Sequence, residues 1–213
     1  MLVRTFHTGG DRNLAYLIAD EASREAVVID PSYSPSDIVA FAEAQSYRVV
    51  YVFCTHDHHD HTNGNTEFEQ KTGVSPLLFG GRDPKSGTVV EGGAAFAIGD
   101  LSVRILHTPG HTTDSICIHI GDALFTGDTL FVGKVGGTDL GEGAERQYTS
   151  LHEVLLKLPD ETRIFPGHDV GAAPESTIGS ERETNPFLLR GDLDSFIELK
   201  RNWAAYKKEH GIE

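Results

Sequence analysis

Apolar residues gather in short runs along this chain, and polar turns separate the runs. β-Branched and aromatic residues are frequent in them, which is typical of strands. The runs that predict strands in the first part of the chain are 2–6, 14–19, 26–29 and 47–53. Mostly short strands are expected between 75 and 125, and the clearest of them are 101–106, 115–120 and 123–125.

A second pattern, in which apolar residues recur every three or four positions, predicts helices between these strands. One helix is expected from the N-cap candidate Ser34 to about Gln45, with a proline in its first turn. A short helix is expected at 62–72. Two further stripes, at 151–158 and 193–204, predict helices in the last third of the chain.

Predicted strands and helices alternate in two halves, and no repeat, low-complexity tract or linker divides them. We therefore expect a single domain that spans residues 1–213. Because each sheet must cover its apolar faces, we expect helices on the outer faces of two packed sheets. The fold class that this pattern predicts is α/β.

Net charge and cysteine content indicate which binding partners and which cellular location to expect for the protein. The 213 residues carry a formal net charge of −14 without a basic patch, so no nucleic-acid partner is expected. No apolar run approaches the ~20 residues that span a membrane, and the N-terminus shows no signal-peptide pattern. Cys54 and Cys117 lie in apolar runs and are expected to be buried free thiols. A cytoplasmic location is therefore expected.

The strongest chemical signal is the sequence T-H-D-H-H-D-H at 55–61. It follows an apolar run at 49–53 and precedes a polar turn, so it lies where a buried strand reaches the surface. Imidazole nitrogens and carboxylate oxygens are ligands that zinc, iron and manganese accept. A metal site is therefore favoured over a solvated polar loop.

The spacing H-x-H-x-D-H resembles the signature of the metallo-β-lactamase superfamily. This resemblance implies a four-layer αββα sandwich with two adjacent metal sites. His56 and His58 would bind the first metal ion, and Asp60 and His61 would bind the second. Each site would then need a further ligand from downstream.

Suitable downstream residues are present, each at a turn after an apolar run. His111 follows T-P-G and would complete the first site, whereas His168 follows F-P-G and would complete the second. Asp128 lies in G-D-T-L-F, which resembles a family motif, and its two carboxylate oxygens would let it bridge both ions. The resemblance extends over about residues 13–187 and makes Asp60 and Asp128 the candidate catalytic residues.

Three polar residues near the cluster are not predicted to be metal ligands. Asp30 ends the run 26–29 close to the cluster, and a structural turn cap is its favoured role. Asp57 is either a surface acid or a partner that orients a ligand imidazole. His59 fills a variable position of the motif and is expected to be exposed or to lie behind the ligands.

Three segments resemble glyoxalase II, which hydrolyses S-acylglutathione thioesters. They are T-H-x-H-x-D-H-x-x-G-N at 55–65, N-L-A-Y-L-I at 13–18 and G-D-T-L-F at 127–131. The resemblance implies a metal-dependent hydrolase with two divalent ions (zinc, iron or manganese) that acts on a small thiol ester or glutathione conjugate. No G-x-S-x-G nucleophile motif competes with a metal mechanism. Lys134 is the candidate substrate-binding residue, because the basic residue that the family has near Gly137 is missing.

An alternative is a persulfide dioxygenase that acts on glutathione persulfide with a single Fe(II). The sequence S-T-I-G-S-E-R at 176–182, followed by N-P, resembles the end of such enzymes and of short bacterial glyoxalase II-like enzymes. Two histidines and one carboxylate hold iron in that family, and the matching residues are His56, His111 and Asp128. The hydrolase is favoured because the dioxygenase's substrate-contacting arginine is Gly137 here.

A non-catalytic metal-binding or thiol-sensing module is a third interpretation. The sequence leaves open the metal, the acyl group, the thiol carrier and whether the chain forms a homo-oligomer.

Overall fold

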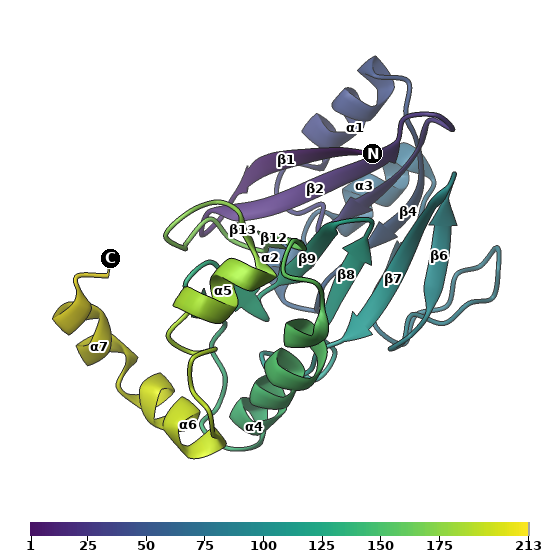
Figure 1. Ribbon diagram of the computed structural model, residues 1–213. Coiled ribbons are helices and arrows are strands. Elements are labelled where there is room, and N and C mark those ends of the chain that lie inside the picture. The colour runs from purple at the N-terminus through teal and green to yellow at the C-terminus, as the bar shows by residue number, and fades with distance from the viewer. Residues whose placement is uncertain (213) are drawn as a thin grey trace.

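The computed structural model describes residues 1–212, and two β-sheets form its centre (Figure 1). The first sheet has the strand order β1-β2-β3-β4-β5. Its strands are β1 Leu2–Gly9, β2 Asn13–Asp20, β3 Glu25–Ile29, β4 Arg48–Phe53 and β5 Pro76–Leu77. The strands β1 to β3 are antiparallel, whereas β3, β4 and β5 are parallel. Parallel neighbours need crossover connections, and helices supply them here.

The second sheet has the order β13-β12-β9-β8-β7-β6. Its strands are β6 Ala95–Ile98, β7 Leu101–His107, β8 Ile116–Ile120, β9 Ala123–Gly127, β12 Arg163–Pro166 and β13 Ser176–Thr177. Only the β9–β12 pair is parallel. A separate two-stranded hairpin consists of β10 (Leu130–Phe131) and β11 (Lys134–Val135).

Helices cover the outer face of each sheet (Figure 1). Those on the first sheet are α1 (Pro35–Ala44) and α3 (Asn65–Thr72). Those on the second sheet are α4 (Glu142–Thr149), α5 (Ile178–Thr184) and α6 (Leu193–Arg201). One apolar core lies between the sheets, and one lies under each helical layer. The fold is the four-layer αββα sandwich that the sequence predicts. The expectation of a single domain stays a prediction.

One of the predicted helices is divided in two by a glycine. Instead of a continuous helix at 62–72, the chain forms α2 (His59–Thr62) and then α3, with a break at Asn63 and Gly64. A Cβ on Gly64 would lie 1.8 Å from the carbonyl oxygen of Pro31. The break therefore lets α2 begin inside the histidine cluster while the backbone packs against the turn after β3.

The other helical predictions also need correction at their ends. The stripe at 151–158 continues the unpredicted helix α4 as a π-helical turn, η1 (Ser150–Val154), and a 3₁₀ turn, η2 (Leu155–Lys157). The stripe at 193–204 is divided at Asn202 into α6 and α7 (Trp203–His210). Ser34 is the N-cap residue of α1, as predicted, but its side chain makes no capping hydrogen bond, because its hydroxyl donates to the carbonyl oxygen of Thr8 at 3.0 Å.

Both cysteines are buried free thiols, as the sequence predicts. Burial raises the pKa of Cys54 above its usual range and that of Cys117 to about 12. Within residues 1–212, none of the helices has the length and hydropathy that crossing a bilayer requires.

At one end of the sandwich, strand β2 of the first sheet meets the end of strand β12 of the second. Asn13 and His168 form an antiparallel bridge, and the amide of Leu14 donates to the carbonyl oxygen of Gly167 at 2.9 Å. The hydroxyl of Tyr16 donates to the carbonyl oxygen of Pro166 at 2.6 Å. This junction fixes the two sheets to each other where β12 ends.

Candidate metal centre

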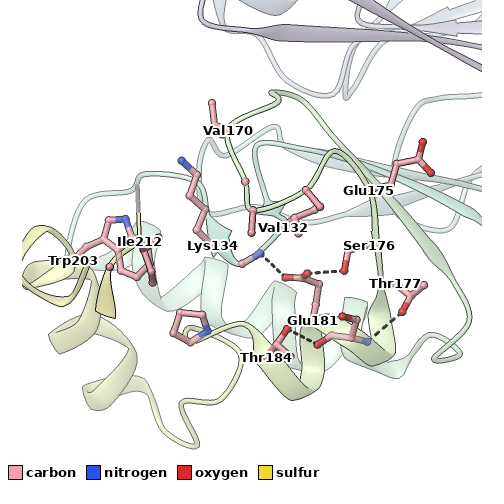
Figure 2. Close-up of a pocket in the computed structure, with 17 residues that line it drawn as sticks. Val132, Lys134, Val170, Glu175, Ser176, Thr177, Glu181, Thr184, Trp203 and Ile212 are labelled. Atoms are coloured by element: carbon pink, nitrogen blue, oxygen red, sulfur yellow. Dashed lines mark hydrogen bonds between the residues drawn. The ribbon is translucent and has the colours of Figure 1, made fainter. Parts of the chain in front are cut away.

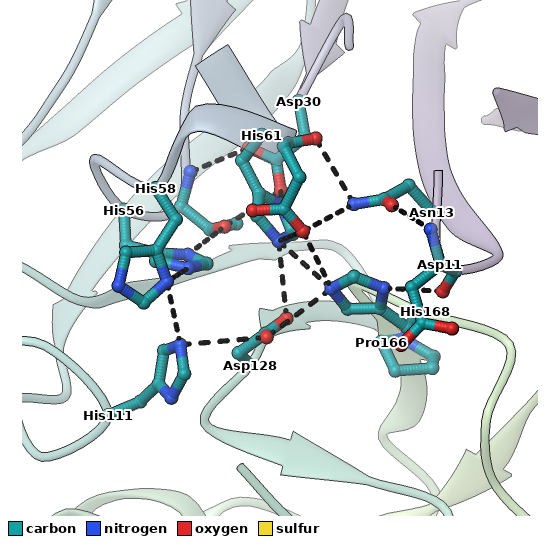
Figure 3. A network of polar contacts seen from close by, with 12 residues as sticks. Asp11, Asn13, Asp30, His56, His58, His61, His111, Asp128, Pro166 and His168 are labelled. Carbon is teal, nitrogen blue, oxygen red and sulfur yellow. Dashed lines mark hydrogen bonds and ion pairs between the residues drawn. The ribbon is translucent and has the colours of Figure 1, made fainter. Parts of the chain in front are cut away.

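All seven predicted ligand residues lie together at this end of the sandwich (Figure 3). They follow the carboxyl ends of four strands, β4, β7, β9 and β12. The residues are His56, His58, Asp60, His61, His111, Asp128 and His168. Strand ends are suited to this purpose, because the strands hold the backbone rigidly while the turns direct side chains toward one point.

We call His56, His58 and His111 the first half-site. The Nδ1 atom of His58 lies 2.9 Å from Nε2 of His56 and 3.0 Å from Nε2 of His111. Zinc–nitrogen bonds of about 2.0–2.1 Å in a tetrahedral site put ligand nitrogens roughly 3.3 Å apart. Three convergent imidazole nitrogens at nearly this spacing fit a divalent transition-metal ion.

We call Asp60, His61 and His168 the second half-site. The Nε2 atoms of His61 and His168 lie 3.2 Å apart. Oδ2 of Asp60 lies 3.7 Å from Nε2 of His61 and 3.4 Å from Nε2 of His168. Two nitrogens and one carboxylate oxygen converge here, and this donor set also fits a divalent ion.

Asp128 lies between the two half-sites. Its Oδ1 is 3.4 Å from Nε2 of His61, while its Oδ2 is 3.4 Å from Nε2 of His168 and 3.6 Å from Nε2 of His111. Oδ1 is buried and has no hydrogen-bond partner within residues 1–212. Leaving a buried polar atom unpaired costs about 1–3 kcal/mol, so a cation at this carboxylate would satisfy it.

Backbone carbonyls orient one imidazole in each half-site. Nδ1 of His111 donates to the carbonyl oxygen of Gly137 at 2.7 Å, and Nδ1 of His168 donates to that of Asp11 at 2.8 Å. Because a carbonyl oxygen only accepts, each Nδ1 carries the proton, and Nε2 presents its lone pair to the centre. Backbone carbonyls carry no signal in the sequence, so these two partners were not predicted.

Asp30 does more than cap a turn. Its Oδ2 accepts from Nδ1 of His61 at 2.9 Å, and its two oxygens accept from the amide and the hydroxyl of Thr55 at 2.7 Å each. It therefore orients a ligand of the second half-site and also fixes the start of the histidine segment. Asn13, likewise not predicted as a site residue, donates from Nδ2 to Oδ2 of Asp60 at 3.0 Å.

The two half-sites differ in the pKa of their imidazoles. In the first, burial and the neighbouring His61 lower the pKa of His56 to about 3. Burial also lowers the pKa of His111, although Asp128 opposes it. In the second, burial is outweighed by Asp30 and Asp128, which raise the pKa of His61 to about 10.

Burial and neighbouring groups also oppose each other in setting the pKa values of His168 and Asp128. Burial alone would lower the pKa of His168, but the hydrogen bond to Asp128 raises it. Burial alone would raise the pKa of Asp128, but its contacts with His168 and His61 hold that pKa well below the usual range. Protonation is therefore favoured at His61 and His168 of the second half-site and disfavoured at His56 and His111 of the first.

The remaining predicted residues lie outside the cluster. His59 is exposed, as expected. Asp57 is exposed too, and its backbone amide donates to the carboxylate of Asp114 at 2.9 Å. Within residues 1–212 its carboxylate makes no hydrogen bond to an imidazole, which favours the surface-acid interpretation.

Lys134 lies in the wall of a cavity of about 870 Å³ (Figure 2). The hairpin β10–β11, the loop 170–173, α5 and Trp203 form the other walls. The ammonium of Lys134 is 5.5 Å from the ring centre of Phe131, whose ring centre is 6.0 Å from that of His168. Burial, Lys207 and Arg12 lower the pKa of Lys134. Phe131 therefore lies between Lys134 and the second half-site, although neither Phe131 nor any of the seven ligand residues lines this cavity.

Comparison with known proteins gives consistent matches. The model of the metallo-beta-lactamase superfamily matches residues 8–79 and 77–168. A probable hydroxyacylglutathione hydrolase of Schizosaccharomyces pombe is 31% identical over 219 residues, covering 86% of this chain and 85% of that protein. The structure of ETHE1 from Myxococcus xanthus is similar with a TM-score of 0.86 and 34% identity, covering 95% of this chain and 91% of that one.

A di-iron-bound form of TTHA1623 is also similar, with a TM-score of 0.71 and 28% identity over 87% of this chain and all of that one. The matched residues of the superfamily model make up more than half of the chain and contain all seven residues of the cluster. The chain therefore belongs to the metallo-β-lactamase superfamily, in the branch of hydroxyacylglutathione hydrolases and ETHE1 that its motifs indicate.

Proposed function

We propose that this protein is a metal-dependent thioester hydrolase of the glyoxalase II type that binds two divalent ions. The observation that carries the proposal is the pair of three-residue half-sites with Asp128 between them. The first ion is assigned to His56, His58 and His111, and the second to Asp60, His61 and His168. The di-iron-bound form of TTHA1623 supports two ions, and zinc, iron and manganese all accept these donors.

The residues of the chain orient the metal-binding imidazoles and provide carboxylates that can accept a proton. Bound ions would supply Lewis acidity and lower the pKa of water. Asp30 and two backbone carbonyls hold the imidazoles in one orientation each. Burial opposes ionisation of Asp60, but the hydrogen bond from Asn13 and the nearby His61 lower its pKa. Asp60 is therefore a carboxylate at neutral pH, and we assign Asp60 and Asp128 as the catalytic carboxylates.

A thiol nucleophile or a thiol sensor suits the structure less well. Both cysteines are buried, and burial raises the pKa of each thiol. A reactive cysteine needs an accessible thiolate, which neither position offers. Buried free thiols also suit the reducing cytoplasm that we propose as the protein's location.

We assign the substrate's thiol-carrier portion to the cavity that Lys134 lines. Glutathione conjugates are small anions, and the cavity offers Lys134 in a chain of net charge −14. The hydrolase relative from Schizosaccharomyces pombe supports a glutathione conjugate. Lys134 would bind the carrier's negative charge in the ground state and the transition state alike.

A second candidate is the iron-dependent persulfide dioxygenase, with one Fe(II) on His56, His111 and Asp128. The likeness to ETHE1 from Myxococcus xanthus favours it. The glycine at 137, where the dioxygenases have an arginine, favours the hydrolase. Nothing lies within 4 Å of a Cβ built on Gly137, so the absence of a side chain there is not forced by packing.

One experiment compares the two candidates directly. Zinc-loaded and iron-loaded samples of the full chain are assayed for hydrolysis of S-lactoylglutathione and for oxygen consumption with glutathione persulfide. Hydrolysis without oxygen uptake supports the proposed function. Oxygen uptake by the iron-loaded sample, without hydrolysis in either sample, would replace it with the dioxygenase. Activity in neither assay would refute both.

A further inference from the structure

A lysine of the C-terminal region lies in unusual surroundings. Lys200 is on α6, between the buried residues Phe196 and Leu199 of the same helix and the ring of Phe187. Its ammonium lies 5.3 Å from the ring centre of Phe196 and 5.8 Å from that of Phe187. Within residues 1–212, no carboxylate lies within 4.0 Å of it.

The ammonium of Lys200 instead donates two hydrogen bonds. It donates to the carbonyl oxygen of Gly136 at 2.9 Å and to Oε1 of Gln147 at 2.6 Å. Burial lowers the pKa of Lys200 to about 8, although Asp139 opposes it. Burying a charge without a counter-charge is unfavourable, and an apolar side chain of similar length often serves stability as well or better. An apolar side chain could pack in this half-buried position, but it could not donate to the carbonyl oxygen of Gly136 and to Gln147.

Gln147, a buried residue of α4, contacts the same carbonyl. Its Nε2 donates to the carbonyl oxygen of Gly136 at 3.2 Å and to that of Thr129 at 3.4 Å. It also packs against Gly110, where an added Cβ would lie 2.4 Å from Cβ of Gln147. Gln147 thus supports the turn that carries His111 as well as the turn at Gly136.

The turn at Gly136 and Gly137 lies directly against the metal centre. A Cβ on Gly136 would lie 1.9 Å from the carbonyl oxygen of Asp128 and 3.2 Å from Nδ1 of His111. The next carbonyl, of Gly137, accepts the hydrogen bond from Nδ1 of His111 at 2.7 Å. Any outward movement of this turn would therefore release His111 first.

We propose that Lys200 and Gln147 are positioning residues that hold the Gly136–Gly137 turn against His111. The pair acts on the first half-site through the backbone carbonyl of Gly136, with Gln147 on α4 and Lys200 on the more distant α6. It fixes the Nδ1–H tautomer of His111 and so keeps the lone pair of Nε2 directed to the first ion. The proposal rests on the proposed function only in that His111 is assigned as a metal ligand.

The test is cobalt(II) binding to the metal-free full chain, which needs no substrate. Lys200→Met removes the donor but keeps the length of the side chain. We expect its affinity for the first equivalent of cobalt to fall about 10-fold. This is the low end of the loss in metal affinity that follows when a hydrogen-bond partner behind a metal ligand is removed. The visible absorption bands of the bound cobalt should shift, because the geometry at His111 changes. The melting temperature of the metal-free variant should stay within a few degrees of wild type.

Three further variants sharpen the result. Lys208→Met removes the same charge from an exposed position of α7 and should bind cobalt like wild type. Lys200→Arg keeps a cationic donor and should recover part of the affinity. Gln147→Leu removes the second donor to the same carbonyl and should also weaken cobalt binding. This last variant serves as the test if Lys200→Met does not fold.

Normal cobalt affinity and an unshifted spectrum in Lys200→Met would overturn the proposal. A fall in affinity accompanied by a large loss of melting temperature, without recovery in Lys200→Arg, would also overturn it, since the lysine would then be merely structural. If cobalt binding changes as expected but the wild-type protein hydrolyses no thioester, the proposed function fails and the positioning role stands.

Discussion

The two half-sites of the metal centre use the same kinds of ligand but support them in different ways. In the first, the partner of His111 is a backbone carbonyl in a glycine-rich turn, and His58 lies at the surface. In the second, His61 is fully buried, and its partner is the buried carboxylate of Asp30. The first half-site therefore has one exposed ligand and two imidazoles, His56 and His111, with lowered pKa values, whereas the second has a buried imidazole, His61, with a raised pKa.

This difference indicates that the two half-sites bind their ions under different conditions. Neutral imidazoles with lowered pKa values are ready to bind a cation without releasing protons. Imidazoles whose pKa is raised by Asp30 and Asp128 must lose a proton before an ion can bind. We infer that the first half-site takes up its ion more readily, and that the second half-site depends more on its surroundings.

The largest effect is expected from His56→Ala, which removes one of three imidazoles of the first half-site. Activity should fall more than about 100-fold, because loss of a ligand costs more than loss of a hydrogen-bond partner that only orients a ligand. Metal content should fall by about one ion per chain. Metal analysis and the rate on the purified variant measure both effects. Full occupancy at a normal rate would break the assignment of the first half-site.

Asp128→Asn tests whether the two half-sites are connected. It keeps the shape of the side chain but removes the negative charge between them. With two ions, the second should bind more weakly and kcat should fall sharply, while the three histidines of the first half-site keep their ion. With a single Fe(II) on His56, His111 and Asp128, that iron should be lost. Two ions remaining in the variant would contradict both arrangements.

Asp30→Asn acts directly on the second half-site and reaches His56 of the first only through the hydroxyl of Thr55. An amide is a weaker acceptor than a carboxylate for Nδ1 of His61, so affinity for the second ion should fall about 10- to 100-fold. The first ion should be weakened much less. Asp57→Asn is the matched control, because Asp57 is an exposed acid close in sequence to the same ligands. Equal weakening of both ions in Asp30→Asn would refute the division between half-sites.

The pH dependence of metal binding should differ between the half-sites. The pKa of His61 is raised to about 10, so its ring carries a proton below that pH, and an ion must displace the proton. Affinity for the second ion should therefore rise about 10-fold per pH unit between pH 7 and 9. The lowered pKa values of His56 and His111 give the first half-site no such dependence from these rings. Competitive zinc titrations at several pH values measure both slopes.

Lys134→Ala should have the smallest effect, since Lys134 belongs to neither half-site. Its contact with an anionic carrier would be similar in the ground state and in the transition state. KM for a glutathione conjugate should rise a few-fold, and kcat should change little. Steady-state kinetics on the fully metal-loaded variant check this. An unchanged KM would leave Lys134 without a part in substrate binding.

Much of this arrangement follows from the sequence, but some of it does not. The apolar runs predict the sheets because short runs of β-branched and aromatic residues between turn residues are typical of buried strands. The motif spacing also predicts that seven residues assemble, since each lies where a strand ends. In contrast, the carbonyls of Asp11 and Gly137 act through the backbone, which every residue possesses. Their role becomes visible only when the tertiary structure brings them to His168 and His111.

The helix boundaries were less predictable for a related reason. A side chain does not fit at Gly64, where α2 and α3 are separated, because Pro31, far away in sequence, occupies the space that a Cβ would need. Lys200 belongs to no motif in the sequence, yet it reaches the turn beside Asp128. Tertiary contacts between distant segments determine both, and local patterns do not record them.

The hydrogen bond between Asp11 and His168 spans 157 positions of the chain, and this has a consequence for synthesis on the ribosome. The amino-terminal sheet can form early, with the histidine segment already at its edge. His168 can join only after the second sheet has emerged, and Lys200 emerges later still. A nascent chain therefore offers incomplete ligand sets for most of its translation, and we expect metal uptake to follow release of the finished polypeptide.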